Sequence, residues 1–519
     1  MQKNNRQAST SRRLCAAVCA ALLLPATLAF SAATPKNNTQ AKSQSPADVG
    51  SWTAPLDLCP TNGNGHCAIG ANFALMHTGK ILFYYFPRPG SGPGSRSVVL
   101  DPNTGIVDDT LVTDPRDIFC SGVHITADGR VIVTGGDAPH AQNNHSGTWN
   151  TTIFDPVTET WSLGADMNFA RWYPTSIELK DGTMLELSGP NEDGTKIQNV
   201  MEIYDPTANT WTALPGTANM PAETLDGTAY PRVTLMTSGK VFLSAPSPTS
   251  YMFDPISNTW KKGPKTVFGK RYYAPHVLLP DLKTLLVSGG SPVSLNGTGT
   301  VTDTVETVDL SQQVPVWVDQ PAGHKMNIAR MNHNLVLLAD GKVLAVGGGA
   351  GGGRFNSPIL TPELYDPATN TWTLMADQTV NRTYHSTAGL LPDGRVLSAG
   401  ADTKLAGQQS YEIYSPPYLF AGARPVITTA PTTLTYNQKF NIVTPDAASI
   451  TRVALIRATA TTHANNMDQR YVDLQFQIVG GKISAKGPLG AAYAPPGYYM
   501  LVILNSSGVP SVMPFVQLQ

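Results

Sequence analysis

Charged side chains are scarce in this sequence, and neither sign dominates. They make up 14% of the 519 residues, against about 25% in an average soluble protein. The formal net charge is only −1, so the composition gives no electrostatic basis for binding nucleic acid or an anionic membrane surface. Long apolar stretches are also missing, because no stretch after residue 30 is long enough to span a bilayer.

The N-terminal residues 1–33 have the pattern of an export signal. A basic start that includes Arg12-Arg13 precedes an apolar stretch at 14–30, and small residues come before Thr34. The arginine pair also fits the twin-arginine route, and an uncleaved anchor is the alternative. We expect cleavage, a disordered polar lead-in at residues 34–50, and a secreted, periplasmic or cell-surface protein with no remaining membrane span.

Cysteine is rare, and two of the five cysteines belong to the signal segment. Cys59 and Cys67 are eight residues apart across a Gly/Asn-rich turn, and we predict a disulfide between them in an oxidising compartment. Cys120 then has no partner. An odd cysteine in an exported protein is either buried and inert or chemically special.

Two short patterns alternate along the rest of the chain, and each occurs seven times. One is a turn and an apolar run, Asp-Gly-Lys/Arg with variants, which often ends in Gly-Gly; the other is Tyr/Phe-Asp-Pro-x-x-x-Thr-Trp. The first begins at Gly79 and, six intervals and 315 residues later, at Gly394, which gives a mean period of about 52 residues. This period, with a Gly-Gly and a later Trp, is the kelch signature of a β-propeller blade.

The ends of the repeat predict a closed ring. The seventh copy, at 414–419, lacks its Thr-Trp, and an orphan segment around Trp52 resembles the missing piece. We infer that the N-terminal strand completes the last blade, which removes exposed sheet edges. After the repeat stops, short alternating runs predict a small β-sandwich. The sequence thus predicts an all-β protein with a seven-bladed kelch-type β-propeller at 51–421 and an immunoglobulin-like β-sandwich at 422–519.

Several chemically active side chains share one phase of the repeat. Because the inner strand of each blade runs along the central channel, we predict that residues at one phase meet at one channel mouth. Taken singly, each is more often an ordinary packing residue. His463 lies in a polar loop of the C-terminal domain and can join them only if that loop enters the channel. The residues at or within one position of this phase are Cys120, Tyr173, Tyr230, Tyr273, Asn332, Tyr384 and His385.

Together these stretches resemble the copper radical oxidases, the family of galactose oxidase and glyoxal oxidase. Arg-Trp-Tyr-Pro and the run at 414–420 are more similar to the glyoxal oxidase branch. The resemblance covers essentially the whole mature chain and implies a propeller followed by an immunoglobulin-like domain. Its motifs are Asp117-Ile-Phe-Cys120, Arg171-Trp172-Tyr173-Pro174, Arg382-Thr-Tyr384-His385-Ser386, and Thr462-His463 with Asn466-Met-Asp-Gln-Arg470.

The resemblance implies one copper ion held by Tyr173, Tyr384, His385 and His463, with Tyr384 axial and acting as general base. It implies a thioether bond between Cys120 and Tyr173 that supports a tyrosyl radical. Two neutral imidazoles and phenolates suit Cu(II). The implied partners are a small aldehyde or primary alcohol and dioxygen, the implied product is hydrogen peroxide, and we expect a monomer.

The match leaves one aromatic residue unassigned, because the family usually places a ring over the modified tyrosine. Trp172 is next to Tyr173, but on a strand its side chain is expected to point away. The loop that starts at Ser291 has no aromatic residue. Repeat phase and sequence proximity predict the pocket walls as Trp172, Tyr230, Arg232, Tyr273 and Arg330.

Two alternatives remain open. One is a galactose or polysaccharide primary-alcohol oxidase, which would use the same site. The other is a kelch glycan-binding or surface-binding module without chemistry. Such a binder has no need for a cysteine, two tyrosines and two histidines to converge.

Overall fold

The computed structural model describes residues 45–61, 67–85, 94–111, 117–138, 146–225, 230–293, 300–351, 356–402 and 407–519. The predicted signal, its cleavage before Thr34 and most of the lead-in lie outside the described residues. So does most of the loop that starts at Ser291. In the described part of the chain, no helix has the length and apolar character needed to cross a bilayer.

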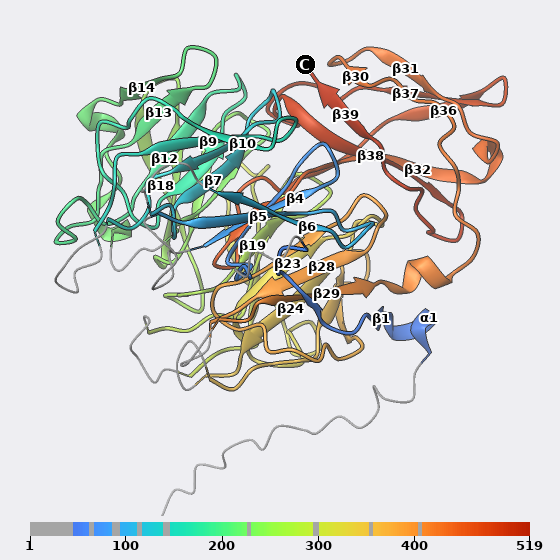
Figure 1. Ribbon diagram of the computed structural model, residues 1–519, viewed down its shortest axis with the longest axis horizontal. Helices are drawn as coiled ribbons and strands as arrows, with labels where there is room; N and C mark the ends of the chain where they lie inside the picture. Colours follow the sequence, from blue (N-terminus) through green and yellow to red (C-terminus); the bar gives the residue numbers. More distant parts are fainter. Residues whose placement is uncertain are drawn as a thin grey trace, which may run out of the picture. The chain divides into compact units, whose positions relative to one another are not determined.

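Seven antiparallel four-stranded units follow one another along the chain, and each is one blade. Figure 1 shows them in chain order by colour. Blades 1 to 3 comprise β3 (Asn72–Leu75), β4 (Ile81–Tyr85), β5 (Arg96–Leu100) and β6 (Val107–Leu111); β7 (Gly122–Ile125), β8 (Val131–Thr134), β9 (Thr151–Asp155) and β10 (Thr160–Leu163); and β11 (Thr175–Glu178), β12 (Met184–Leu187), β13 (Glu202–Asp205) and β14 (Thr210–Ala213).

The remaining blades have the same up-and-down order, and the prediction of a seven-bladed propeller is confirmed. Blades 4 to 7 comprise β15 (Arg232–Leu235), β16 (Val241–Ala245), β17 (Thr249–Asp254) and β18 (Thr259–Lys265); β19 (His276–Leu278), β20 (Thr284–Ser288), β21 (Val305–Asp309) and β22 (Trp317–Asp319); β23 (Met331–Leu337), β24 (Val343–Gly349), β25 (Glu363–Asp366) and β26 (Thr371–Leu374); and β27 (Ser386–Leu390), β28 (Val396–Gly400), β29 (Ser410–Ser415) and β1 (Ser51–Trp52).

The glycine of the first repeat pattern lies in the turn between the first and second strands of each blade. Gly79 and Gly394 have φ of 83° and 85°, a region that glycine enters without steric cost. In the degenerate copy of blade 5, Leu282 takes this position with φ 57°. The turn therefore explains why a glycine stands ahead of the second strand in six of the seven blades.

The ring closes as predicted, because the N-terminal strand supplies the outer strand of blade 7. In the antiparallel pair of β1 and β29, Ser51 lies opposite Ser415 and Trp52 opposite Tyr414. β2 (Leu56–Asp57) also pairs with β29. Cys59 and Cys67 form a disulfide just after this closure.

The predicted disorder of the lead-in is wrong for its last residues. The short helix α1 (Pro46–Val49) precedes β1, and Val49 is buried. The Val49 carbonyl accepts hydrogen bonds from the Tyr414 hydroxyl at 2.8 Å and from the Ala376 amide at 3.0 Å. These bonds to distant parts of the chain order a segment that local composition marks as polar and unstructured.

The C-terminal part of the chain is a sandwich of two sheets with its own apolar core. The predicted boundary between 421 and 422 lies between its first strand and the preceding short helix η4, and it stays a prediction. The larger sheet comprises β30 (Thr433–Leu434), β39 (Phe515–Leu518), β38 (Gly497–Asn505), β32 (Ile450–Arg457) and β35 (Tyr471–Asp473); the smaller comprises β31 (Lys439–Ile442), β37 (Lys482–Lys486) and β36 (Phe476–Val479). Short 3₁₀ helices are η2 (Gly216–Ala218), η3 (Ala222–Thr224), η4 (Pro417–Phe420) and η5 (Ala447–Ser449).

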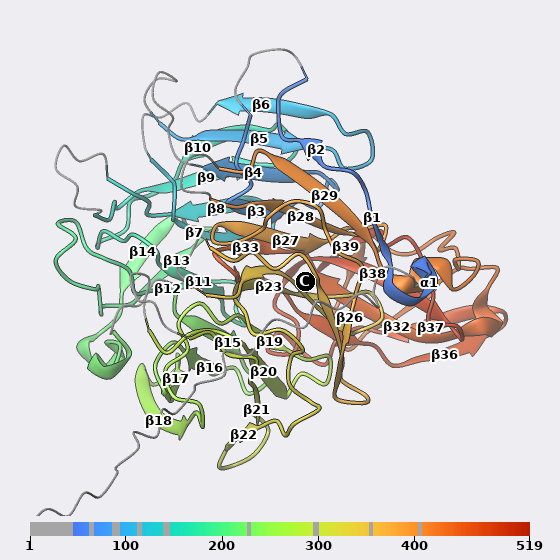
Figure 2. The ribbon, with the colours of Figure 1, turned by 90° about the horizontal axis from the view of Figure 1, so that it is seen from below.

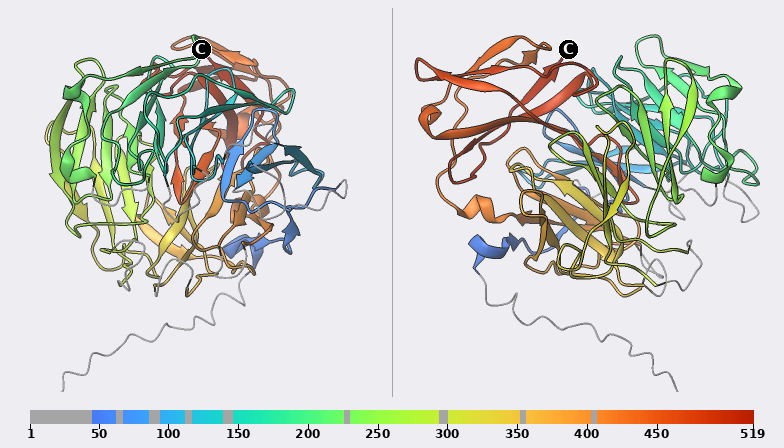
Figure 3. Two further views of the ribbon diagram at one scale, coloured as in Figure 1. Left: turned by 60° about the vertical axis from the view of Figure 1, so that its left-hand side comes forward. Right: turned by 180° about the vertical axis from the view of Figure 1, so that it is seen from behind.

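One hairpin leaves the sandwich and joins the propeller. β33 (Ala460–Thr462) and β34 (Asn465–Asn466) extend the sheet of blade 1, where β33 pairs with its inner strand β3. Figure 2 shows β33 among the inner strands β3 and β27, and Figure 3 shows red strands in the middle of the ring of blades. The loop that contains His463 therefore enters the channel, as the site prediction required.

Four blades contain the same buried ion pair, which the sequence prediction missed. Its arginine precedes Tyr173, Tyr273, Asn332 or His385 by two or three residues, and its glutamate lies on the third strand. Each arginine also donates to a carbonyl at the end of the second strand. The pairs, all with side chains at most 1% exposed, are Arg171–Glu202 (3.0 Å), Arg271–Glu306 (2.8 Å), Arg330–Glu363 (2.7 Å) and Arg382–Glu412 (3.2 Å).

We expect Glu412→Gln and Glu306→Gln each to lower the free energy of unfolding by about 3–5 kcal/mol, because each leaves a buried guanidinium without its counter-charge. Equilibrium urea unfolding measures the loss. Lys240→Gln is the control, since it breaks the exposed pair of Lys240 and Asp254 and exposed pairs contribute little. Wild-type stability of both glutamine variants would contradict a stabilising role for these pairs.

Candidate metal centre

The repeat phase identified in the sequence corresponds to one unusual backbone conformation. Six of the residues at this phase have positive φ, although none is glycine. Such a conformation costs about 1–3 kcal/mol per residue and persists only where the surroundings impose it. The six are Cys120 (58°), Tyr173 (57°), Tyr230 (51°), Tyr273 (59°), Asn332 (59°) and His385 (66°).

Main-chain hydrogen bonds between neighbouring blades hold these residues in an arc at the entry to the inner strands. The Tyr173 amide donates to the Cys120 carbonyl at 2.8 Å, and the Tyr230 amide to the Tyr173 carbonyl at 3.0 Å. The Asn332 amide donates to the Tyr273 carbonyl at 3.0 Å. These bonds offset part of the conformational cost and help to place one side chain from each of blades 2 to 7 at the same height.

His463 reaches this level at the tip of the inserted hairpin. It occupies the first of two central turn positions between paired Thr462 and Asn465, and both turn residues have positive φ, 51° for His463 and 58° for Ala464. Two-residue hairpin turns of this kind favour Asn and Gly. The Thr462 hydroxyl donates to the Ala71 carbonyl at 2.9 Å, which ties the strained tip to blade 1.

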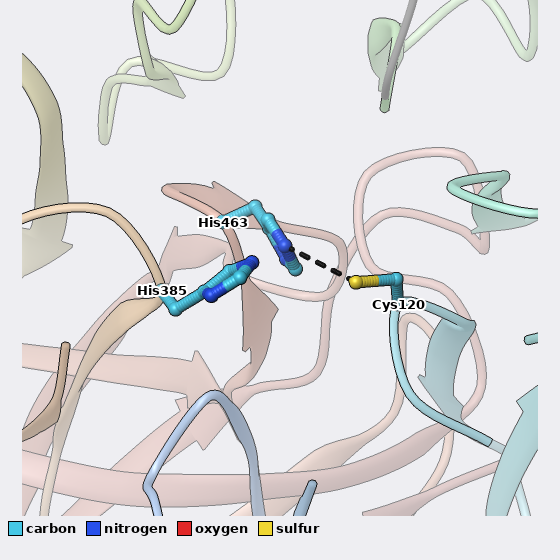
Figure 4. A group of neighbouring side chains, drawn as sticks. All are labelled: Cys120, His385 and His463. Carbon is cyan, nitrogen blue, oxygen red and sulfur yellow. Dashed lines mark hydrogen bonds between the residues drawn. The ribbon is translucent and has the colours of Figure 1, made fainter. Parts of the chain in front are cut away.

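Five side chains converge at the channel mouth. The hydroxyls of Tyr173 and Tyr384 are 2.8 Å apart. Cys120 Sγ is 3.5 Å from His463 Nε2, and Figure 4 shows these two side chains beside His385. The ring centroids of His385 and His463 are 4.3 Å apart. One potential ligand atom from each of Cys120, His385 and His463 lies within 4.8 Å of the others. The arrangement brings together residues separated by up to 343 positions in the chain.

The imidazoles have defined orientations because each Nδ1 has a polar neighbour. His385 Nδ1 is 2.6 Å from an Asp402 carboxylate oxygen, and His463 Nδ1 is 2.6 Å from the Thr462 hydroxyl. Nε2 is therefore the nitrogen of each ring that would bind a metal. Carboxylate or hydroxyl partners of this kind are the usual outer shell of histidine ligands.

Burial keeps the acidic groups of this cluster neutral in the absence of a cation. It raises the pKa of the Tyr173 phenol well above its ordinary value, because the phenolate would lose its hydration. It also raises the pKa of the Cys120 thiol, against the opposing effect of its hydrogen bond with Tyr173. A metal ion at this position would supply the positive charge that stabilises a phenolate.

The sequence matches two protein families that together cover most of the described chain. Residues 94–418 match the family described as Glyoxal oxidase N-terminus, and residues 424–518 match Galactose oxidase-like, Early set domain. The chain belongs to the glyoxal oxidase and galactose oxidase family of copper radical oxidases. As a member of this family it is a copper-dependent oxidase.

Individual relatives agree with this assignment. The chain is 30% identical over 497 residues to a galactose oxidase of Gibberella zeae, a match that covers 89% of this chain and 70% of the relative. It is 29% identical over 472 residues to the aldehyde oxidase GLOX of Vitis pseudoreticulata, a match that covers 82% of this chain and 86% of the relative. The chain also superposes on a solved structure with a TM-score of 0.79 and 26% sequence identity. That structure is described as a novel fungal alcohol oxidase with catalytic diversity among the AA5 family, in complex with copper. The match covers 91% of this chain and all of that one.

The donor set at the channel mouth fits copper, the cofactor of this family. Two imidazole nitrogens and two phenol oxygens form a mixed N/O set of the kind that Cu(II) prefers. Each histidine has its Nδ1 engaged, and the Tyr384 ring lies 3.9 Å from that of His385 and 5.1 Å from that of His463. The set is drawn from blades 3 and 7 and from the sandwich hairpin, so it forms only in the folded chain.

The predicted orientation of Trp172 is wrong. Its ring centroid lies 4.2 Å from that of Tyr173, with an angle of 66° between the planes. Residues 172–173 precede β11 instead of belonging to it, and the positive φ of Tyr173 breaks the alternation of a strand. Trp172 therefore contacts the tyrosine proposed for modification, as does Tyr230.

Both arginines predicted as pocket walls are buried and have partners in the protein. Arg330 is fully buried inside blade 6, where it donates to Glu363. Arg232 donates to the carbonyls of Tyr230, Ala274 and His463. It therefore connects blades 4 and 5 to the hairpin tip.

Tyr230 and Tyr273 also face little free space. With Arg232 they line a cavity of about 20 Å³, which is room for about one water molecule. Tyr230 donates its hydroxyl to the Ser121 carbonyl at 2.9 Å and packs against Tyr173, with ring centroids 5.0 Å apart. This cavity is too small for a substrate, so the substrate contacts of Tyr230, Arg232 and Tyr273 are not found there.

A second cluster of potential ligands, His124, Glu178 and Asp468, lies deeper in the channel. Arg457 occupies it, donating to Asp468 at 3.1 Å and to Glu178. Burial lowers the pKa of His124 to about 4, so this imidazole adds no charge at neutral pH. We interpret the cluster as an anchor for the hairpin because the arginine already supplies its cation. The sequence indicates this cluster only weakly, through the two charged residues Arg457 and Asp468 on either side of His463.

Proposed function

We propose that this chain is an exported mononuclear copper radical oxidase that oxidises small hydrated aldehydes of the glyoxal type or primary alcohols. Dioxygen is the electron acceptor and hydrogen peroxide the product. The observation that carries the proposal is the convergence of Cys120, Tyr173, Tyr384, His385 and His463, which come from four separate segments. A binding module gains nothing from this combination.

In the proposed site, Nε2 of His385 and of His463 and the phenol oxygen of Tyr173 hold one copper ion, with Tyr384 as a further ligand. Cys120 is joined to Tyr173 by a thioether bond. Bound copper supplies a one-electron acceptor, and Tyr173 in its oxidised radical form supplies a second, so together they remove two electrons from a substrate. The sulfur substituent makes the Tyr173 ring easier to oxidise.

The protein residues then divide the proton and hydrogen transfers. Tyr384 takes the hydroxyl proton of the alcohol or aldehyde hydrate, and Tyr173 takes a hydrogen atom from the adjacent carbon. The two hydroxyls are 2.8 Å apart, so one small substrate can reach both. The two electrons and two protons that leave the substrate reduce dioxygen to hydrogen peroxide, so the reaction balances.

Export is part of the proposal. The disulfide of Cys59 and Cys67 is typical of an oxidising compartment, and the N-terminal sequence has the signal pattern given above. Twin-arginine export would fit a protein that folds around its metal before translocation.

A peroxide-coupled assay tests the function and resolves the substrate class. We expect copper-loaded protein to release peroxide in air with one or more of glyoxal, methylglyoxal, glycolaldehyde and galactose, and metal-free protein to release none. A preference for galactose would favour the alternative of a sugar or polysaccharide alcohol oxidase. Absence of peroxide with every aldehyde and alcohol tested would contradict the oxidase assignment and favour a binding module.

A further inference from the structure

Asp402 is connected to the segment Thr383–His385 at three points. Its carboxylate lies 2.6 Å from His385 Nδ1, and its amide donates to the Tyr384 carbonyl at 2.8 Å. The Thr383 hydroxyl donates to its carbonyl at 3.2 Å. Two of these contacts are through the main chain, so the carboxylate is held in place by more than its own rotamer.

The backbone at the end of β28 is shaped to deliver this carboxylate. The strand ends at Gly400, which has φ 69°, and Ala401 follows with φ 149°, a conformation that a residue with a side chain rarely adopts. Other blades end this strand with glycines, as at Gly289-Gly290 in blade 5. Blade 7 has Gly400 at the first of these positions but Ala401 at the second, and the Asp402 carboxylate that follows lies 2.6 Å from His385 Nδ1.

The two histidines at the channel mouth therefore have different outer partners. His385 has a carboxylate, whereas His463 has the neutral hydroxyl of Thr462. A carboxylate fixes the Nδ1–H tautomer and makes Nε2 a stronger donor than a hydroxyl does. It also adds a negative charge next to a ligand set that already contains two phenols.

We propose that Asp402 is a positioning residue for His385, which fixes Nε2 toward copper, strengthens this ligand and favours Cu(II) over Cu(I). The inference rests on the proposed copper site. Outer-shell partners of this kind typically contribute about 10–100-fold to metal affinity. The same negative charge would lower the Cu(II)/Cu(I) potential of the site.

Asp402→Ala and Asp402→Asn separate these effects. The alanine variant removes both hydrogen bond and charge, and the asparagine variant keeps an acceptor oxygen but removes the charge. We expect copper affinity, measured by competition with a chelator, to fall about 10–100-fold for alanine and less for asparagine. Both should change the Cu(II) hyperfine splitting in electron paramagnetic resonance and raise the Cu(II)/Cu(I) potential.

Asp377→Asn is the matched control, because it removes an exposed carboxylate that accepts a bond from the Thr361 hydroxyl and contacts no histidine in the described structure. Thermal unfolding of the metal-free proteins checks that all variants fold. If wild-type protein binds copper and either Asp402 variant matches it in copper affinity and paramagnetic resonance spectrum, the inference about Asp402 is overturned and the proposed function still stands. If wild-type protein takes up no copper, the proposed function fails and the inference with it.

Discussion

Replacing Cys120 by serine is expected to abolish a copper-dependent loss of mass and nearly all oxidase activity. In wild-type protein, thioether formation between Cys120 and Tyr173 removes two hydrogens, because one thiol hydrogen and one ring hydrogen leave as the bond forms. Serine has no sulfur to form the bond or to ease oxidation of the ring. We expect the turnover rate to fall by about 10³-fold or more, equivalent to about 4 kcal/mol of transition-state stabilisation.

Intact-protein mass before and after aerobic copper addition measures the cross-link directly. Tyr230→Phe is a suitable control because its ring packs on Tyr173 at 5.0 Å, yet it takes no part in the proposed bond. The control should still show the mass loss, whereas Cys120→Ser and Tyr173→Phe should not. A wild-type protein that keeps a thiol at Cys120 after copper and air would contradict the radical mechanism.

The architecture could be predicted because each blade repeats its own turn chemistry. The Asp-Gly turn and the Asp-Pro-x-x-x-Thr-Trp pattern mark strand ends, and their number and the orphan Trp52 segment determine the ring and its closure. Repeat phase also predicted which residues meet, because equivalent positions in a propeller lie at equivalent heights. Local sequence was therefore enough to predict the strands and their neighbours wherever the structure is periodic.

The errors occur where the backbone departs from the strand pattern. The prediction for Trp172 assumed alternation, but the positive φ at Tyr173 turns the chain so that both rings meet. Arg330 lies two residues before Asn332, which has the phase of the site, and belongs to a buried pair with Glu363. Composition and period do not report φ, and they do not show whether an arginine faces a channel or a blade interior.

The contributions of His463 and Asp402 depend on tertiary contacts. His463 belongs to a different domain, and only the pairing of β33 with β3 brings it to the channel mouth. Asp402 follows His385 by 17 residues and reaches it across the end of a strand pair. Family resemblance supplied His463. Its motifs also contain Arg171, Arg382 and Asp468, but nothing in the sequence pointed to the ion pairs of these residues or to Asp402.

Tyr384→Phe is expected to lower kcat by about 10²–10⁴-fold while copper still binds, because general base catalysis typically contributes that much. The variant keeps the ring that packs on His385 at 3.9 Å and removes only the hydroxyl, which lies 2.8 Å from that of Tyr173. The cross-link forms from Cys120 and Tyr173, so the mass loss on copper addition should persist. Steady-state peroxide release and intact mass together measure the two effects.

Tyr273→Phe provides the comparison, because Tyr273 occupies in blade 5 the repeat phase and positive-φ conformation that His385 has in blade 7, and its ring lies 6.3 Å from that of Tyr384. We expect this variant to lose much less activity than Tyr384→Phe. Equal losses in the two variants would contradict a specific role of the Tyr384 hydroxyl in proton transfer. A loss confined to Tyr384→Phe, with the cross-link intact, would assign the proton transfer to the Tyr384 hydroxyl, since the Tyr173 ring would still be available to accept hydrogen from carbon.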